Sequence, residues 1–329
     1  MVENIVIVGA GQAAVSCAAR LRALSPDCSI TLIGDEPYLP YQRPPLSKAF
    51  LTGDLSTERL AFRPRSWYEA QSIALKSGMQ VNSIDRHKRV VILESGEQLH
   101  YDKLVLTTGS RPRALPESLA PNVSRIYTLR GIEDAQRLKD ELRPGNKVLV
   151  VGGGYVGLEF AASAAKAGLE IVIVEAAERI LGRVSSAQTA DYFRELHRSH
   201  GVEILEGVGV LSICDIAGTT QVSLSNGKQI DVDFMVVGIG AIANDQLAVE
   251  CGLETQHGIL INGACQTSDP LIFAAGDCAT MIREAVTRRI ESVQNAIEQG
   301  ETAAYSLLGL DIPPASTPWF WSGQYDTKL

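Results

Sequence analysis

Two apolar runs, each followed by a glycine-rich turn and an alanine-rich segment, organise the chain. The runs, Asn4–Val8 and Lys147–Val151, are dominated by valine and isoleucine and predict buried strands. The segments after the turns, residues 13–24 and 156–167, are rich in alanine and predict helices. The chain therefore contains two units with the order strand, glycine turn, helix.

Both units continue in the same order. A second apolar run follows each helix, at residues 29–33 and 171–175, and predicts a second strand. The remaining pattern predicts a short helix at 46–51, antiparallel strands at 90–93 and 101–107, a helix at 187–197, a hairpin at 222–230, a strand at 234–238 and a helix at 291–308. The repetition indicates a duplication at the scale of a domain. We expect an α/β protein in which a domain of residues 114–241 is inserted into one formed by 1–113 and 242–318, with 319–329 beginning a further domain.

The two turns match the dinucleotide-binding fingerprint. They are Gly9-Ala10-Gly11-Gln12-Ala13-Ala14 and Gly152-Gly153-Gly154-Tyr155-Val156-Gly157. The first glycine makes the tight turn, the second lets the backbone approach a pyrophosphate, and the third position must be small for helix and strand to pack. The helix N-terminus then offers free N–H groups to the phosphates. Two matches in the correct context predict two Rossmann-like nucleotide sites.

Composition and charge narrow the class. The 329 residues are 45% hydrophobic with a net charge of −8, which suits a soluble two-domain protein and argues against general nucleic-acid binding. No apolar run reaches the roughly 20 residues that span a bilayer, and no signal peptide is visible, so we expect a cytoplasmic protein. The six cysteines are scattered singly, without the spacing of a metal site.

An acid at the end of the second strand binds a ribose in such units. Asp35 and Glu36 are the candidates in the first unit, with Asp35 preferred, and Glu175 is the candidate in the second. A 2′-phosphate about 4 Å from the Glu175 carboxylate would meet roughly 4 kcal/mol of repulsion, so NADH is expected over NADPH. Arg179 and Arg183 are close enough in sequence to soften this preference.

The segment 267–277 favours FAD in the first unit. It has the form Thr, six residues, Ala, one residue, Gly, Asp. A strand there would deliver Gly276 to a second helix start beside the pyrophosphate, and the Asp277 carboxylate could accept a hydroxyl of the ribityl chain. The alternative is that Asp277 only caps a helix.

With these residues placed, the chain resembles the flavoprotein disulfide reductase superfamily. Within it, the chain is similar to the NADH-dependent ferredoxin reductases of oxygenase and cytochrome P450 systems. The strings that carry the resemblance are Leu39-Pro40-Tyr41-Gln42-Arg43-Pro44-Pro45-Leu46-Ser47-Lys48, Gly152-Gly153-Gly154-Tyr155-Val156-Gly157-Leu158-Glu159, Glu291-Ser292-Val293-Gln294-Asn295-Ala296 and Pro318-Trp319-Phe320-Trp321-Ser322. The resemblance implies the glutathione-reductase-like fold, with an NAD domain inserted into an FAD domain.

The resemblance and the motifs together give a set of site residues. Those expected to bind FAD are Gly9, Gly11, Ala14, Asp35, Arg43, Lys48, Val81, Thr108, Gly109, Arg130, Gly276, Asp277 and Val293. Those expected to bind NAD are Gly152, Gly154, Gly157, Glu159, Glu175, Gly238 and Gly240.

Lys48 and Glu159 are the catalytic candidates, because the resemblance implies that they form an ion pair beside the flavin ring. A cation there favours the reduced ring, and its carboxylate partner lowers the cost of burying it. The alternative is a salt bridge that only ties two domains together.

The resemblance also implies the electron acceptor. Disulfide-reducing members place cysteines beside the flavin, and none lies in 40–48 here. Electrons must then leave from the flavin itself, to a [2Fe-2S] ferredoxin. Alternatives are a rubredoxin or quinone acceptor, or an NADH-sensing interaction protein like apoptosis-inducing factor; the oligomeric state stays open. Relatives continue past Trp321 with a small antiparallel-sheet domain, usually after Trp-Ser-Asp-Gln-Tyr-Asp, where this chain has Gly323 in place of the first Asp.

Overall fold

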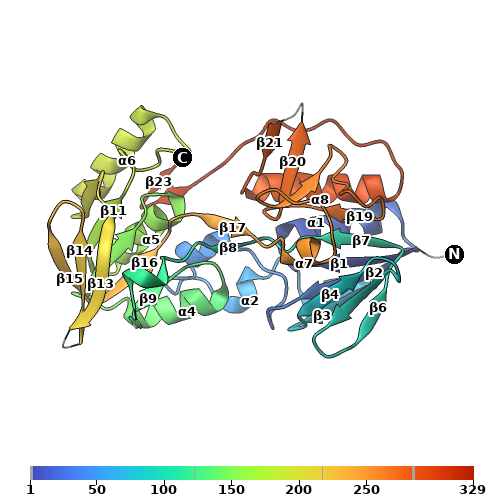
Figure 1. Ribbon diagram of the computed structural model, residues 1–329, viewed down its shortest axis with the longest axis horizontal. Coiled ribbons are helices and arrows are strands. Elements are labelled where there is room, and N and C mark those ends of the chain that lie inside the picture. The colour runs from blue at the N-terminus through green and yellow to red at the C-terminus, as the bar shows by residue number, and fades with distance from the viewer. Residues whose placement is uncertain (1–2, 122, 217, 284–285) are drawn as a thin grey trace. The chain divides into compact units, whose positions relative to one another are not determined.

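The computed structural model describes residues 3–121, 123–216, 218–283 and 286–329 (Figure 1). The chain divides into two compact units. Unit 1 consists of Met1–Gln42, Ala61–Arg111 and Ile242–Phe320, and unit 2 of Arg43–Leu60, Pro112–Ala241 and Trp321–Leu329. Residues 43–60, which the sequence analysis assigns to the outer domain, thus group with unit 2.

Unit 1 is built on a five-stranded parallel sheet with the order β19-β7-β1-β2-β3. The strands are β1 (Asn4–Val8), β2 (Ser29–Gly34), β3 (Ile73–Ser77), β7 (Lys103–Leu106) and β19 (Ile272–Ala274). Ile5, Leu104 and Val105 in the middle strands are fully buried. A central parallel strand is covered on both faces, which explains these continuous apolar runs.

Helices α1 (Gln12–Leu24) and α8 (Val293–Leu307) pack closely against each other in unit 1, and Figure 1 draws them side by side. Small residues make this possible, because a Cβ at Gly300 would lie 2.4 Å from the Ala13 carbonyl oxygen. Ser292 begins α8 by accepting a hydrogen bond from the Asn295 N–H at 3.1 Å. The first glycine turn therefore lies beside a second, well-anchored helix.

Further elements complete unit 1. An antiparallel sheet is formed by β4 (Val81–Asp85), β5 (Val90–Leu93) and β6 (Gln98–His100). A mixed sheet is formed by β18 (Ile259–Ile261), β20 (Ala279–Arg283) and β21 (Val286–Arg288). The short helices are α3 (Arg65–Ala70) and α7 (Gln246–Glu250).

Unit 2 repeats the plan with the parallel order β12-β11-β10-β16-β9. The strands are β9 (Ile126–Tyr127), β10 (Lys147–Val151), β11 (Glu170–Glu175), β12 (Glu203–Glu206) and β16 (Phe234–Val237). Helix α5 (Tyr155–Lys166) follows the second glycine turn, and eight of its residues are buried. The duplication and the Rossmann-like fold expected from the sequence are confirmed.

The other elements of unit 2 surround this sheet. They are η1 (Pro44–Ser47), α2 (Thr57–Leu60), η2 (Glu117–Leu119), α4 (Ile132–Glu141), α6 (Ala187–Ser199), the antiparallel strands β13 (Val210–Ile216), β14 (Thr219–Leu224) and β15 (Gln229–Val232), and the terminal hairpin β22 (Gly323–Gln324) and β23 (Thr327–Lys328). The chain passes between the units within two short strands, β8 (Ser110–Pro112) and β17 (Ala241–Ala243), which pair with each other.

Two expected elements are wrong. The helix expected at 46–51 is the 3-10 helix η1 followed by turns, because Lys48 leaves helical geometry with φ −131° and ψ −117°. The strand expected within 101–107 is not antiparallel to residues 90–93. It is β7, a parallel central strand of the main sheet, whereas β5 pairs with β4 and β6. Apolar alternation does not reveal which partner a strand takes.

Candidate functional site

Glycine is required at the first position of the turn in unit 1. Gly9 has φ +110°, and a Cβ there would lie 2.2 Å from the Thr107 carbonyl oxygen. The Gly9 N–H donates to the Ile33 carbonyl oxygen at 2.8 Å, which ties the turn after β1 to the end of β2. Ala14, at the third fingerprint position, is fully buried. The turn is therefore held against the sheet by contacts that admit no side chain at Gly9.

The second glycine of this turn faces open space. Gly11 is the N-cap of α1, and among the described residues no atom lies within 4 Å of a Cβ placed there. None of the described side chains caps the helix. The space beside the first N–H groups of α1 is therefore open, and a side chain at position 11 would narrow it. An open helix N-terminus of this kind is what a pyrophosphate needs.

The turn in unit 2 has the same geometry. Gly152 has φ +107°, and a Cβ there would lie 2.4 Å from the carbonyl oxygen of Gly238. A Cβ at Gly157 would lie 2.3 Å from the Gly152 carbonyl oxygen, so helix and strand pack at this position. Gly154 is the N-cap of α5, with the nearest atom 4.0 Å from its Cβ position. Gly240 also has a positive φ, +107°.

Glu175 is bound to the glycine turn of unit 2. Its Oε2 accepts from the Gly153 N–H and its Oε1 from the Ala177 N–H, both at 2.8 Å. These two bonds fix the carboxylate beside the glycine turn. In unit 1, Asp35 is exposed, and its Oδ1 accepts a hydrogen bond from the Glu36 N–H at 3.1 Å.

The two arginines near Glu175 differ in their contacts. Arg179 donates to the carbonyl oxygens of Ser185 at 2.8 Å and Ser186 at 3.3 Å, so its guanidinium is engaged by the loop before α6. Arg183 is exposed, and its Nη2 lies 3.9 Å from the Cβ position of Gly240. Of this pair, Arg183 is the cation better able to reach a ligand beside Glu175.

Gly276 and Asp277 lie near α1 and α8. Gly276 has φ +83°, and its N–H donates to Gln299 Oε1 on α8 at 2.8 Å. Asp277 Oδ2 accepts from Ser110 Oγ at 3.0 Å. The expected helix start is wrong, since the chain turns here into β20, and the alternative in which Asp277 caps a helix fails for the same reason. Gly276 nevertheless lies beside α1, as expected, although no helix begins there.

The remaining residues expected at the flavin site fall in both units. Thr108 and Gly109 follow β7 and bond to Asn244, whose side-chain N–H donates to the Thr108 carbonyl oxygen at 2.9 Å. Val81 is the first residue of β4 and Val293 the first of α8. In unit 2, Arg43 Nη1 donates to the Arg130 carbonyl oxygen at 2.9 Å. Arg43, Lys48 and Arg130 belong to unit 2 and the other ten to unit 1.

Lys48 and Glu159 form an ion pair within unit 2. Lys48 Nζ donates to Glu159 Oε2 and, at 3.0 Å, to the Pro44 carbonyl oxygen. The Lys48 side chain is 24% exposed and that of Glu159 only 9%. Glu159 lies in the second turn of α5 and is one of its buried residues. The pair that the resemblance implies is therefore present.

Three neighbours of this pair were not expected from the sequence. Ser47 Oγ donates to Glu159 Oε2 at 2.6 Å, and Ser322 Oγ donates to Oε1 at 2.8 Å. The Trp321 ring centroid lies 5.5 Å from Lys48 Nζ. Ser322 is 163 residues from Glu159 in sequence, so only the fold could bring them together.

Burial makes several of the cysteine thiols poor nucleophiles. All six are free. Burial raises the pKa of the Cys265 thiol to about 12, and burial also raises the pKa values of Cys17 and Cys278. The described residues include no group of three or more side chains able to hold a metal ion. Within the same residues, no helix has the length and apolar character needed to cross a bilayer.

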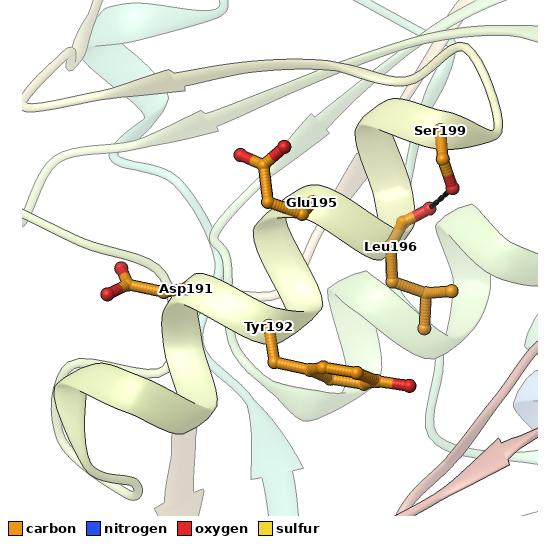
Figure 2. Close-up of a pocket in the computed structure, with 5 residues that line it drawn as sticks. All are labelled: Asp191, Tyr192, Glu195, Leu196 and Ser199. Atoms are coloured by element: carbon orange, nitrogen blue, oxygen red, sulfur yellow. Dashed lines mark hydrogen bonds between the residues drawn. The ribbon is translucent and has the colours of Figure 1, made fainter.

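An open hollow on α6 contains none of the expected site residues. It is lined by Asp191, Tyr192, Glu195, Leu196 and Ser199, as Figure 2 shows. The Ser199 hydroxyl donates to the Leu196 carbonyl oxygen at 2.7 Å within the helix itself. Two carboxylates and no cation make this surface unsuitable for a dinucleotide.

Comparisons with known proteins agree on one family. The family model described as pyridine nucleotide-disulphide oxidoreductase matches residues 3–300. Putidaredoxin reductase from Pseudomonas putida is 42% identical, over 99% of this chain and 79% of that protein. Rhodocoxin reductase from Rhodococcus erythropolis is 40% identical, over 99% of this chain and 77% of that protein.

Solved structures give the same result. The reductase in a covalent complex of putidaredoxin reductase with putidaredoxin superposes with a TM-score of 0.93 at 41% identity, covering 98% of this chain and 79% of that one. The ferredoxin reductase for the CYP199A2 system from Rhodopseudomonas palustris superposes with a TM-score of 0.92 at 40% identity, covering 99% and 81%.

Proposed function

The chain belongs to the pyridine nucleotide-disulphide oxidoreductase family, and we propose that it is an NADH-dependent ferredoxin reductase that passes electrons through FAD to a [2Fe-2S] ferredoxin. Family membership implies the use of a flavin and a nicotinamide nucleotide by an oxidoreductase. The observation that carries the finer proposal is the similarity over 99% of the chain to reductases named for putidaredoxin, rhodocoxin and ferredoxin.

We assign FAD to the glycine turn of unit 1, which lies in the domain that the sequence analysis bounds at residues 1–113 and 242–318. Two features support the assignment. Gly11 leaves the N-terminus of α1 open, and Gly276 approaches from the other side of α1's first turn, where its Cβ position lies 3.1 Å from Ala13 Cβ. The Asp277 carboxylate follows directly and is a suitable acceptor for a ribityl hydroxyl.

We assign NADH to the glycine turn of unit 2, which lies in the domain that the sequence analysis bounds at residues 114–241. The Glu175 carboxylate is fixed by the Gly153 and Ala177 N–H groups and would accept hydrogen bonds from the adenosine ribose. Because the carboxylate is held in place, it would repel the 2′-phosphate of NADPH, and this supports NADH as the coenzyme.

FAD, when bound, would supply the chemistry of taking a hydride from a nicotinamide and releasing electrons one at a time. The protein's own contribution is electrostatic. Lys48 would supply a positive charge to stabilise a reduced flavin, and Glu159 holds the Lys48 ammonium by a charge-assisted hydrogen bond. No cysteine lies in 40–48, and burial raises the pKa values of three other thiols, which supports electron release from the flavin itself rather than through a thiol.

The test is anaerobic stopped-flow spectroscopy of the purified flavoprotein. NADH should bleach the flavin absorbance rapidly, and a [2Fe-2S] ferredoxin should restore it. Restoration by rubredoxin or a quinone but not by ferredoxins would identify another acceptor. Slow turnover with every acceptor, together with an NADH-dependent change in oligomer size, would identify a sensing protein instead. A purified protein that binds no flavin would contradict the proposal.

A further inference from the structure

We propose that Ser322 and Gln324, in the terminal hairpin, are positioning residues for Glu159 and couple it to the buried imidazole of His197. The proposal deepens the proposed function, because it rests on the role given there to Lys48 and Glu159. All of these residues belong to unit 2.

The carboxylate of Glu159 has its two oxygens divided between two sets of donors. Oε2 accepts hydrogen bonds from the Lys48 ammonium and the Ser47 hydroxyl, whereas Oε1 accepts one from the Ser322 hydroxyl at 2.8 Å. A carboxylate held at one oxygen can rotate about its terminal bond, but one held at both cannot without breaking a hydrogen bond. Ser322 therefore fixes the direction in which Glu159 presents Oε2 to Lys48.

The Ser322 hydroxyl is in turn connected to His197. Gln324 Nε2 donates to Ser322 Oγ at 3.3 Å, and Gln324 Oε1 lies 2.8 Å from His197 Nε2. On the other side of the ring, the Tyr325 hydroxyl lies 3.1 Å from His197 Nδ1. Together these contacts link α6, the hairpin and α5.

The chemistry of the groups gives this chain of hydrogen bonds one direction. A carboxylate oxygen only accepts, so Ser322 donates to Glu159; its oxygen then accepts from the Gln324 amide. The Gln324 carbonyl must accept from His197 Nε2–H, which leaves Nδ1 as an acceptor for the Tyr325 hydroxyl. The network assigns one tautomer to His197, neutral and protonated on Nε2.

Burial makes the arrangement strict. His197 is 0% exposed, and Ser322 and Gln324 are each 1% exposed. A buried polar group that loses its partner is costly, so each member constrains the next. The network is therefore a rigid support running from His197 to the ion pair.

Two substitutions and one control test the proposal in the flavin-loaded enzyme. Ser322→Ala removes the donor to Glu159 Oε1. Gln324→Glu keeps the shape but reverses the hydrogen bond to Ser322, because a carboxylate at 324 can only accept; the Ser322 hydroxyl is then drawn away from Glu159 Oε1. Thr327→Val, in the same hairpin, removes the hydroxyl whose oxygen lies 3.3 Å from the Tyr192 hydroxyl oxygen.

Two measurements are made on each protein. The first is the rate of flavin reduction by NADH, separated from NADH affinity by varying its concentration. The second is nitrogen NMR of 15N-histidine-labelled enzyme without NADH, which distinguishes a protonated from an unprotonated Nδ1. Ser322→Ala and Gln324→Glu should each slow reduction about tenfold, the effect of losing one hydrogen bond to a charged group, and Thr327→Val should leave it unchanged.

The NMR measurement does not depend on activity. In the unsubstituted enzyme, His197 Nδ1 should be unprotonated at pH 7. In Gln324→Glu it should become protonated, because the new carboxylate beside Nε2–H favours the positively charged ring. A protonated Nδ1 in the unsubstituted enzyme would overturn the proposal even if a variant failed to fold. Unchanged reduction rates in folded Ser322→Ala and Gln324→Glu would overturn it as well. An unsubstituted enzyme that does not oxidise NADH would instead refute the proposed function, while the NMR result would still report the network.

Discussion

Lys48 Nζ donates to Glu159 Oε2 across 111 residues of sequence, joining the segment after η1 to the first half of α5. The pair is partly shielded from water rather than deeply buried, since the Lys48 side chain keeps 24% of its exposure. A pair in this position costs little to desolvate, yet removing one partner leaves a nearly buried charge. That asymmetry makes the pair suitable for testing by substitution.

Replacing Lys48 tests its electrostatic role. Lys48→Met should slow flavin reduction by NADH at least about tenfold, because the charge that stabilises the reduced ring is lost. Lys48→Arg keeps the charge and should retain most of the rate. Single-turnover stopped flow measures both. Equal rates in the two variants would remove the catalytic role and leave only a salt bridge that holds unit 2 together.

Replacing Glu175 tests coenzyme choice. Glu175→Ala should raise kcat/KM for NADPH relative to NADH, because the repulsion between the carboxylate and the 2′-phosphate disappears. That repulsion is roughly 4 kcal/mol, so the ratio should change by at most about a thousandfold. Part of the change will be a loss of NADH binding, because the ribose loses its acceptor. The matched control is Glu178→Ala, which removes a nearby exposed acid. A wild-type enzyme with comparable kcat/KM for both coenzymes would already contradict the prediction.

Two glycines of the first turn should behave differently. Gly9→Ala places a Cβ 2.2 Å from the Thr107 carbonyl oxygen at φ +110°, so the folded protein should be lost or strongly destabilised. Gly11→Ala meets no described atom within 4 Å and should leave stability unchanged while weakening FAD binding at least about tenfold, by narrowing the approach to α1. Thermal unfolding of the apoprotein and FAD titration measure the two effects. Full FAD affinity in Gly11→Ala would place the flavin elsewhere.

The sequence predicted what depends on local pattern. Both glycine turns, their strands and helices, and the acid Glu175 could be recognised because spacing and residue type determine them. Resemblance added the Lys48–Glu159 pair, which no local pattern reveals. The partners of Glu159 could not be predicted, since Ser322 reaches it from the other end of the chain and serine at that position has no distinctive signal. For the same reason β7 was assigned the wrong partners: its apolar residues fit an antiparallel hairpin as well as a central parallel strand.

His197 should make the stability of the protein depend on pH. Burial lowers the pKa of this imidazole below its ordinary value of about 6.5. Gln324 and Tyr325 from the hairpin contact the ring, and both can hydrogen-bond to its neutral form. His200, the residue after α6, also disfavours the charged form.

The sign follows from the protons bound in each state. Above pH 6.5 the ring is neutral both folded and unfolded, and it contributes no pH dependence. As the pH falls below about 6.5, the unfolded chain takes up a proton that the folded protein does not, so the free energy of unfolding decreases. The limiting slope is about 1.4 kcal/mol per pH unit, until the lowered pKa of the folded state is reached.

Urea unfolding of the flavoprotein between pH 8 and 5 measures this effect. His197→Gln should be less stable than the unsubstituted protein at pH 8, because it loses buried contacts, but its stability should fall less between pH 7 and 5. His87→Gln, which removes an exposed imidazole in unit 1, should keep the full dependence. An equal acid-induced loss in His197→Gln and the unsubstituted protein would show that other groups carry the pH dependence, because the substituted side chain cannot take up the proton on which the argument depends.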